Sequence, residues 1–315
     1  MFGNSNPTLN KDVFAPAQTW EDLDRQGRGV PGVNMGRAGS AGTRTGAGSG
    51  HDGTLSDADI NRAVPASIAA SHKVMTLQGT VNKSLFLLAL VVTAALGTWV
   101  LVAEGRSPGL GYGLTIGGAI VGCILGLVMA FWPKGSPFLA PIFGVAEGAF
   151  VGGISSIYAM QFGGKAIADG KVVLNTGLIF NAALLTFAIA GSMLALYAFR
   201  VIRPGRVFYN AVFVGSIALI GYTLVAFVLG MFGFPSLRSV FDPNNGGLVS
   251  IGFSVLVLIL GSAFFVIDFD TVNNGVKNRA EKYYEWYGAY AITSTLVFVY
   301  IEALRLMAKL TGRRE

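Results

Sequence analysis

The sequence predicts an all-α membrane protein with seven transmembrane helices, preceded by a disordered N-terminal tail. Of its 315 residues, 52% are hydrophobic and only 13% are charged, which is too apolar for a soluble protein of this length. The apolar residues gather in seven runs, and each run approaches the roughly 20 residues that cross a bilayer core. Because backbone polar groups need partners within lipid, these runs are predicted to be helices.

Residues 1–75 are predicted to form a disordered cytoplasmic tail, separate from a membrane domain of residues 76–315. The tail is rich in Gly, Ser, Ala and Arg and poor in large apolar residues, so burial cannot offset its ordering entropy. It lacks the compact apolar core of a signal peptide. No Gly-Lys-Ser/Thr step follows its glycines, which argues against a phosphate-binding loop.

The predicted helices follow one another with short connectors. They are placed at residues 84–103, 112–132, 138–160, 177–199, 207–230, 248–268 and 288–308. Glycines recur at every fourth position in the second and third runs, at Gly118, Gly122 and Gly126 and at Gly144, Gly148 and Gly152. This spacing puts each set on one helix face, where backbones approach closely, so we expect helix packing here instead of a glycine-lined pore.

The basic residues predict the orientation in the membrane. The formal net charge of +6 reflects Lys and Arg at the ends of the runs, which favours an orientation signal over nucleic-acid binding. One side carries ten of them: Arg62, Lys73, Lys83, Lys134, Arg200, Arg203, Arg206, Lys277, Arg279 and Lys282. The other side carries Arg106, Lys165, Lys171 and Arg238. The amino terminus is therefore predicted to be cytoplasmic.

Seven crossings would place the basic segment that begins at Lys309 on the outer side, against this rule. Either packing holds the last helix in place, or that helix re-enters and the segment stays inside.

Few ionisable residues fall within the runs, and such residues are functional candidates because charge inside a membrane is costly. They are Glu147, Asp268, Asp270, Glu302 and Arg305. Asp268 and Asp270 point about 200° apart on a helix, so only one of them faces the bundle centre. Asp268 is the deeper of the two. For Glu302 the alternatives are a salt bridge to Arg305, three residues on, and a contact with an acid of the sixth run.

Four motifs carry a resemblance to a known family. They are "FFVIDFDTV", "LVFVYIEALRL", "MAFWPKG", which contains Lys134, and the Glu147–Gly148 step. The chain resembles the Bax inhibitor-1/YccA-like family of transmembrane Bax inhibitor motif proteins over about residues 80–310. The Gly-rich tail and "SNP" near its start are similar to the actinobacterial branch.

The resemblance implies a last helix surrounded by the other six. It also implies that Glu302 and a carboxylate of the sixth helix share a proton and form a pH-sensitive latch on a calcium leak, with Lys134 as a nearby basic residue. Asp268 and Asp270 are the two candidates for that carboxylate, and Asp268 is favoured because it lies deeper in the run. Two close carboxylates cannot both ionise cheaply, and once separated they offer oxygens to a hard cation. Calcium would be the permeant ion near Asp268 and Glu302, with no bound cofactor, in a bacterial plasma membrane.

The chain departs from the family pattern at three points. The last-helix acid is Glu302 where relatives have Asp, so its carboxyl reaches further. The acids of the last two runs stand about two helical turns further apart along the chain than is usual for the family. Lys134 replaces a forked arginine of some relatives and acts only as a point charge.

Other functions fit the sequence to different degrees. The main alternative is a non-conducting regulatory protein that binds a membrane protease or another membrane complex, which the resemblance also supports. An enzyme is not expected. An intramembrane aspartyl protease would need a "GxGD" step, which is missing, and light sensing would need a Schiff-base lysine before Lys309 in the last run.

Overall fold

A computed structural model describes residues 74–103, 105, 107–162, 167–168, 171–172, 174–202, 204–232 and 239–312. The predicted tail, residues 1–75, lies outside these residues except at its last two positions. The helical core described below belongs to one compact unit, Met75–Val276 with Ala280–Glu315.

The described residues form seven long helices, which confirms the predicted fold class. They are α3 (Leu77–Ala103), α4 (Pro108–Phe131), α5 (Ser136–Gln161), α6 (Thr176–Ala198), α7 (Arg206–Met231), α8 (Leu248–Lys277) and α9 (Tyr284–Gly312). The 3-10 turn η3 (Pro133–Gly135) joins α4 to α5. Strands β1 (Ile167–Ala168) and β2 (Lys171–Val172) pair antiparallel between α5 and α6. All seven helices are long and apolar enough to cross a membrane, so the chain is a multi-pass membrane protein.

Several helices extend beyond the predicted apolar runs. α3 begins at Leu77 instead of 84, and α9 begins at Tyr284 instead of 288. α8 continues past its predicted end at Asp268 to Lys277. Hydropathy marks the part of a helix that suits lipid, whereas intrahelical hydrogen bonds continue through polar residues. The Asn274 side chain supports the extension of α8 by donating a 2.9 Å hydrogen bond to Asp270, one turn earlier.

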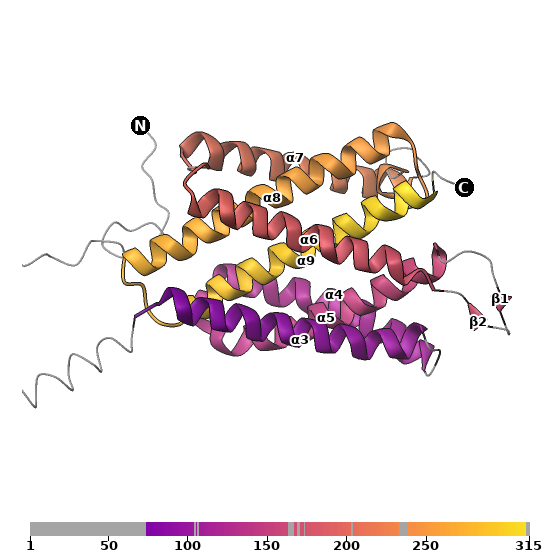
Figure 1. Cartoon of the computed structure of the whole chain (residues 1–315), viewed down its shortest axis with the longest axis horizontal. Coiled ribbons are helices and arrows are strands. Elements are labelled where there is room, and N and C mark those ends of the chain that lie inside the picture. Colours follow the sequence, from indigo (N-terminus) through magenta and orange to yellow (C-terminus); the bar gives the residue numbers. More distant parts are fainter. Residues whose placement is uncertain are drawn as a thin grey trace, which may run out of the picture. The chain divides into compact units, whose positions relative to one another are not determined.

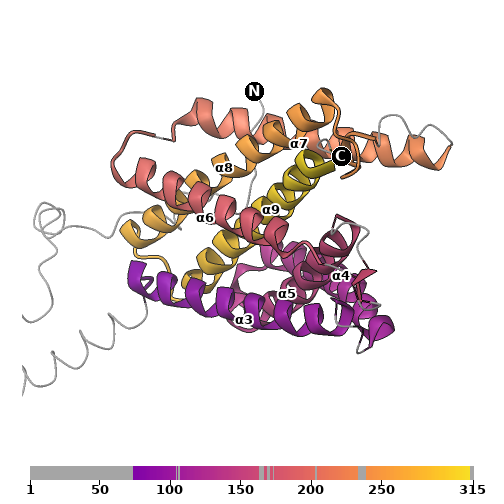
Figure 2. The same cartoon turned by 45° about the vertical axis from the view of Figure 1, so that its right-hand side comes forward.

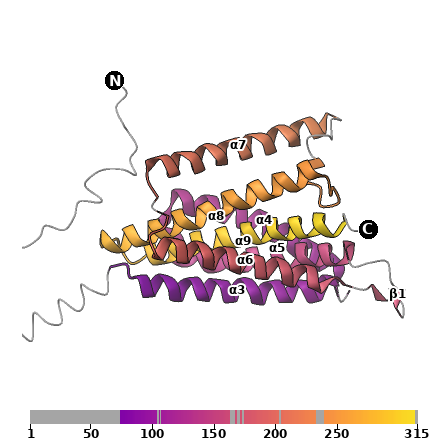
Figure 3. The same ribbon diagram turned by 45° about the horizontal axis from the view of Figure 1, so that its top comes forward.

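The last helix, α9, lies at the centre of the unit. Figures 1 and 2 show it running with α6 and α8 on one side and α3 and α5 on the other. It packs against α3, α5 and α6 along its length. It also reaches α4 through a hydrogen bond from Tyr290 and α8 through a hydrogen bond from Thr295. Figure 3 shows α8 lying between α7 and α9, so α7 takes the outer place.

The glycine faces are packing surfaces, as predicted. A Cβ atom on Gly148 would collide with the carbonyl oxygen of Val91 on α3, and one on Gly152 with the carbonyl oxygen of Ala95. On α4, a Cβ atom on Gly118 would collide with the carbonyl oxygen of Ala146 on α5. These helices therefore meet backbone to backbone, which is how helices associate when lipid supplies no hydrophobic drive between them.

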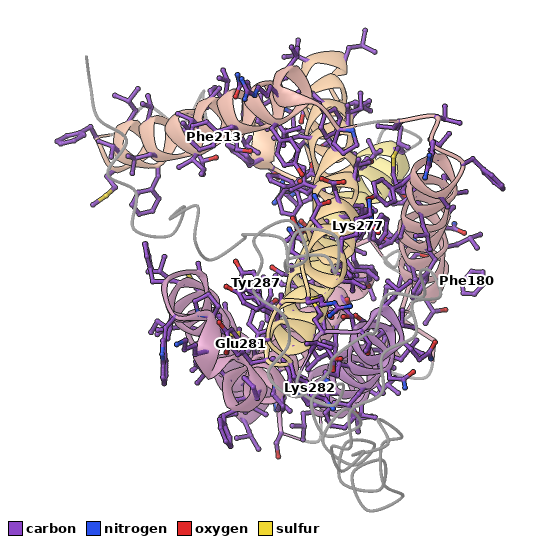
Figure 4. All side chains as sticks on the ribbon, turned by 90° about the vertical axis from the view of Figure 1, so that its left-hand side faces the viewer. Phe180, Phe213, Lys277, Glu281, Lys282 and Tyr287 are labelled. Atoms are coloured by element: carbon purple, nitrogen blue, oxygen red, sulfur yellow. The ribbon has the colours of Figure 1, made fainter. Side chains whose placement is uncertain are left out.

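The outer faces of the helices carry apolar side chains. Phe180 of α6 is 69% exposed, and Figure 4 shows it pointing away from the neighbouring helices. Phe213 of α7 is similarly exposed. A surface of this kind suits contact with lipid and is rare on soluble proteins.

Candidate functional site

The candidate site is a set of acidic side chains around the central helix α9. A short polar stretch, Thr293–Thr295, interrupts the apolar sequence of this helix. The Thr295 hydroxyl donates a 2.6 Å hydrogen bond to the carboxylate of Asp268 on α8. Asp268 therefore faces α9 from within α8, the orientation expected of the deeper aspartate.

Glu147 approaches the same level of α9 from the opposite neighbour, α5. The rings of Phe143 and Tyr290 lie 4.9 Å apart, and the hydroxyls of Ser155 and Tyr300 lie 2.8 Å apart. These two contacts set α5 and α9 side by side in a parallel direction. Glu147 lies one turn after Phe143 on α5. It is therefore level with the residues one turn after Tyr290, and these form the polar stretch of α9.

Tyr290 stands about one turn before the polar stretch of α9, and its hydroxyl donates a 3.1 Å hydrogen bond to the carbonyl oxygen of Gly126 on α4. Glu147 is half-buried, and among the described residues it accepts no hydrogen bond and forms no ion pair. The Glu147 carboxylate lies against Gly122 of α4, where an added Cβ atom would stand 2.7 Å from its Oε1 atom. The absence of a side chain at Gly122 therefore makes the space that Glu147 occupies.

Glu302 is buried and forms an ion pair within its own helix. It is 2% exposed, and its Oε2 atom lies 2.5 Å from the Nη1 atom of Arg305. Its other oxygen, Oε1, and the Nε atom of Arg305 have no hydrogen-bond partner among the described residues. The salt bridge is the simpler of the two alternatives set out for Glu302, and it leaves one carboxylate oxygen of Glu302 and one guanidinium nitrogen of Arg305 unsatisfied.

The structure gives Asp268 and Glu302 separate partners. Asp268 bonds to Thr295, and Glu302 stands seven residues further along α9. At about 1.5 Å per residue this separation is about 10 Å along the helix axis. Glu147 is the acid at the same level of α9 as Asp268, and the sequence motifs did not predict this pairing. Their common level depends on how three helices are aligned with one another, which no local motif records.

Asp270 faces a different set of neighbours from Asp268, in agreement with their spacing on the helix. It accepts hydrogen bonds from the hydroxyls of Tyr197 on α6, at 3.0 Å, and Tyr209 on α7, at 2.8 Å. The Asn274 amide also donates to it. This aspartate therefore joins α6, α7 and α8, and a packing role explains its contacts.

Lys134 lies in the η3 turn and is exposed. It makes no hydrogen bond or ion pair with the other residues that the structure describes. Its position does not connect it to the acids along α9.

Lys309 is a buried residue that the sequence reading placed in an outer tail. Its ammonium group donates to the carbonyl oxygens of Val240, at 2.6 Å, and Ser250, at 3.0 Å, and to the hydroxyl of Ser254, at 2.8 Å. The side chain thereby ties the end of α9 to the start of α8 and the connector before it. Lys309 stands four residues after Arg305 and so on the same face of the helix, and this spacing was the sequence feature that could have indicated its burial.

Glu285 is a second buried charge that the sequence reading passed over, as part of a polar connector. It forms an ion pair with Lys83 and accepts hydrogen bonds from the backbone N–H and the hydroxyl of Thr76. Gly79 on α3 provides room for its carboxylate, since a Cβ atom there would collide with it. These contacts fasten the start of α9 to the start of α3.

The described residues hold no group of three or more His, Cys, Asp or Glu side chains placed to bind one metal ion. The acids stand at successive levels along α9 instead. A resident calcium ion needs six to eight oxygen ligands, and neither Asp268 with Thr295 nor Glu302 with Arg305 provides such a set.

Comparison with known proteins places these features in context. A family model described as Bax inhibitor 1 like matches residues 6–312. The match contains all seven helices and extends beyond the expected residues 80–310 into the amino-terminal region. No curated protein and no solved structure matches the chain.

Proposed function

The chain belongs to the Bax inhibitor 1-like family, and we propose that it is a pH-sensitive leak pathway for calcium along the central helix. The observation that carries this proposal is the placement of Glu147 and Asp268 on two helices that flank the same polar level of α9. Carboxylate and hydroxyl oxygens are the ligands that calcium prefers. Glu302, about 10 Å further along α9, is the next acidic position on the proposed path.

The proposed gate uses protonation of the acids at this level. In a membrane interior, ionising both Glu147 and Asp268 is costly unless a cation lies nearby. At low pH the pair therefore holds a proton, and the helices stay in contact. As the pH rises both acids ionise, repel each other and attract calcium, so the flux increases.

Glu302 has a different part in this proposal, because Arg305 already neutralises its charge. A direct latch between Asp268 and Glu302 would require about 10 Å of movement along α9 relative to α8, so it belongs to another conformation. In the conformation described here, the free Oε1 atom of Glu302 is the group available to a cation that has passed Asp268.

We also propose that the protein lies in a bacterial plasma membrane with its amino terminus in the cytoplasm. The excess of Lys and Arg on one side supports this orientation. Lys309, which opposed it, donates all its described hydrogen bonds within the protein and so is not a free charge at the membrane surface. Since α9 is one uninterrupted helix, a full crossing explains it better than re-entry.

Calcium flux through the purified full-length protein in liposomes tests the proposal. With a calcium indicator trapped inside, we expect flux that increases from acidic to neutral pH and is missing from protein-free liposomes. Absence of flux at every pH would overturn the leak pathway. That result would favour the non-conducting alternative, a regulatory protein that binds a membrane protease or another membrane complex.

A further inference from the structure

An elongated groove of about 410 Å³ lies between α3, α5, α6 and α9. Its walls include Val92, Leu96 and Trp99 of α3 and Ala183 and Phe187 of α6, and its floor includes Tyr300 of α9. The groove is separate from the acids of the proposed pathway. Its volume falls within the roughly 300–1,000 Å³ of typical ligand sites.

Three of the four hydroxyl groups that line the groove have partners in the protein, and the fourth, that of Thr176, stands at the end of the lining along α6. Ser155 and Tyr300 share a hydrogen bond of 2.8 Å across the floor. Thr186 donates a 2.8 Å hydrogen bond to the carbonyl oxygen of Ala182. An ordered water needs two to four polar partners, so these walls favour an apolar occupant that makes no hydrogen bonds.

The groove opens toward the lipid. Its floor is buried, with Ser155 4% exposed and Val297 7% exposed. Its rim is open, since Leu96 is 61% exposed and Phe187 52% exposed. All four helices that form the groove span the membrane, so the solvent at this opening is the hydrocarbon of the bilayer.

The groove also runs along the helices, in the direction that a lipid chain takes in a bilayer. Along α3 its lining runs from Leu88 to Trp99, and along α6 from Thr176 to Phe187. Each stretch covers about 16 Å of helix axis at about 1.5 Å per residue. A slot of this length, parallel to the helices and lined mostly by apolar side chains, matches an extended hydrocarbon chain.

We propose that this groove is a binding site for one acyl chain of a membrane phospholipid. The chain fills a space that would otherwise leave the wall atoms without dispersion contacts. It also touches α9 beside the Ser155–Tyr300 hydrogen bond, which holds the central helix to α5. The occupant therefore becomes part of the packing around α9.

Trp99 supplies a direct measurement, because it lines the groove and bromine atoms on an acyl chain quench tryptophan fluorescence on contact. Trp20, Trp132 and Trp286 are replaced by Phe in the full-length chain, leaving Trp99 as the only tryptophan. The detergent-solubilised protein is titrated with a phosphatidylcholine brominated in one acyl chain, and the signal is normalised to the unbrominated lipid. We expect saturable quenching with one lipid per protein.

Ala183→Phe fills the groove and is expected to abolish the saturable quenching. Ala188→Phe is the matched control, since Ala188 lies on the exposed side of the same helix, outside the groove, and this variant should behave like the parent. Val92→Phe narrows the groove from its open rim and serves as a second test should Ala183→Phe fail to fold.

Two results would overturn the proposal. One is quenching that grows in proportion to the brominated lipid and is equal in Ala183→Phe and Ala188→Phe, which indicates ordinary contact with surrounding lipid. The other is saturable quenching by brominated stearic acid but not by the brominated phospholipid, which indicates a fatty-acid site instead.

Discussion

Thr295 of α9 donates a 2.6 Å hydrogen bond to Asp268 of α8, at the level that Glu147 reaches from α5. The polar level of α9 is thus flanked by two acids that come from different neighbours. Under the proposed gate, a change in the charge of either acid alters the packing around this level. This arrangement makes the polar stretch of α9 the expected point of pH control.

Replacing either acid of this level by its amide should remove the pH dependence of calcium flux in liposomes. Asp268→Asn and Glu147→Gln each mimic the protonated acid, so flux should stay near its low-pH value, and the double variant should behave like each single one. Asp270→Asn is the matched control, because Asp270 faces Tyr197 and Tyr209 instead of α9. Unchanged pH dependence in both single variants would refute the gate.

Removal of Arg305 alone should destabilise the protein more than removal of the whole ion pair. Arg305→Gln leaves the carboxylate of Glu302 buried without a cation, a defect that costs about 3–5 kcal/mol in buried pairs. Glu302→Gln together with Arg305→Gln removes both charges and should regain most of the lost stability. Thermal unfolding in detergent measures the difference; equal losses in the single and double variants would contradict it.

The same substitution, glycine to alanine, should change the stability of the protein in opposite directions at two adjacent glycines of α4. Gly118→Ala pushes a methyl group into the backbone of α5 and should lower stability by about 1–3 kcal/mol. Gly117→Ala meets nothing within 4 Å. It should gain up to about 1 kcal/mol from the better helix propensity of alanine. Melting temperatures of the two variants in one detergent test this pair, and equal shifts would argue against the close contact of α4 with α5.

The amino terminus should be on the cytoplasmic side of the membrane. Ser40→Cys, combined with Cys123→Ser to remove the natural thiol, places one cysteine before the first helix. A thiol reagent that does not cross membranes should label it in inverted vesicles and leave it unlabelled in intact cells. Labelling in intact cells would reverse the orientation drawn from the basic residues.

The helices and their glycine faces were predictable because each depends on a pattern within one segment. Runs of apolar residues mark spans, and glycines four apart mark one face, as Gly148 and Gly152 confirm. The opposite orientation of Asp268 and Asp270 follows from helix geometry in the same way. The pairing of Asp268 with Thr295 depends on how α8 and α9 are aligned, which the sequence does not record locally.

The buried charged residues are the other features of the structure that could not be predicted from the sequence. Glu285 and Lys309 stand near the two ends of the last run, where a charged residue normally reaches water. Their burial follows from partners far away in the chain, Lys83 for Glu285 and Ser250 with Ser254 for Lys309. Only the path of the folded backbone brings these groups together.

The central position of α9 has a consequence for the biogenesis of the protein. This helix leaves the ribosome after α3–α8, yet its fully buried residues Ala303 and Leu304 belong to a core that it shares with α5, α6 and α8. A nascent chain that has inserted only the first six helices lacks these side chains and leaves Asp268 without Thr295. This core can therefore close only after the last helix has been inserted.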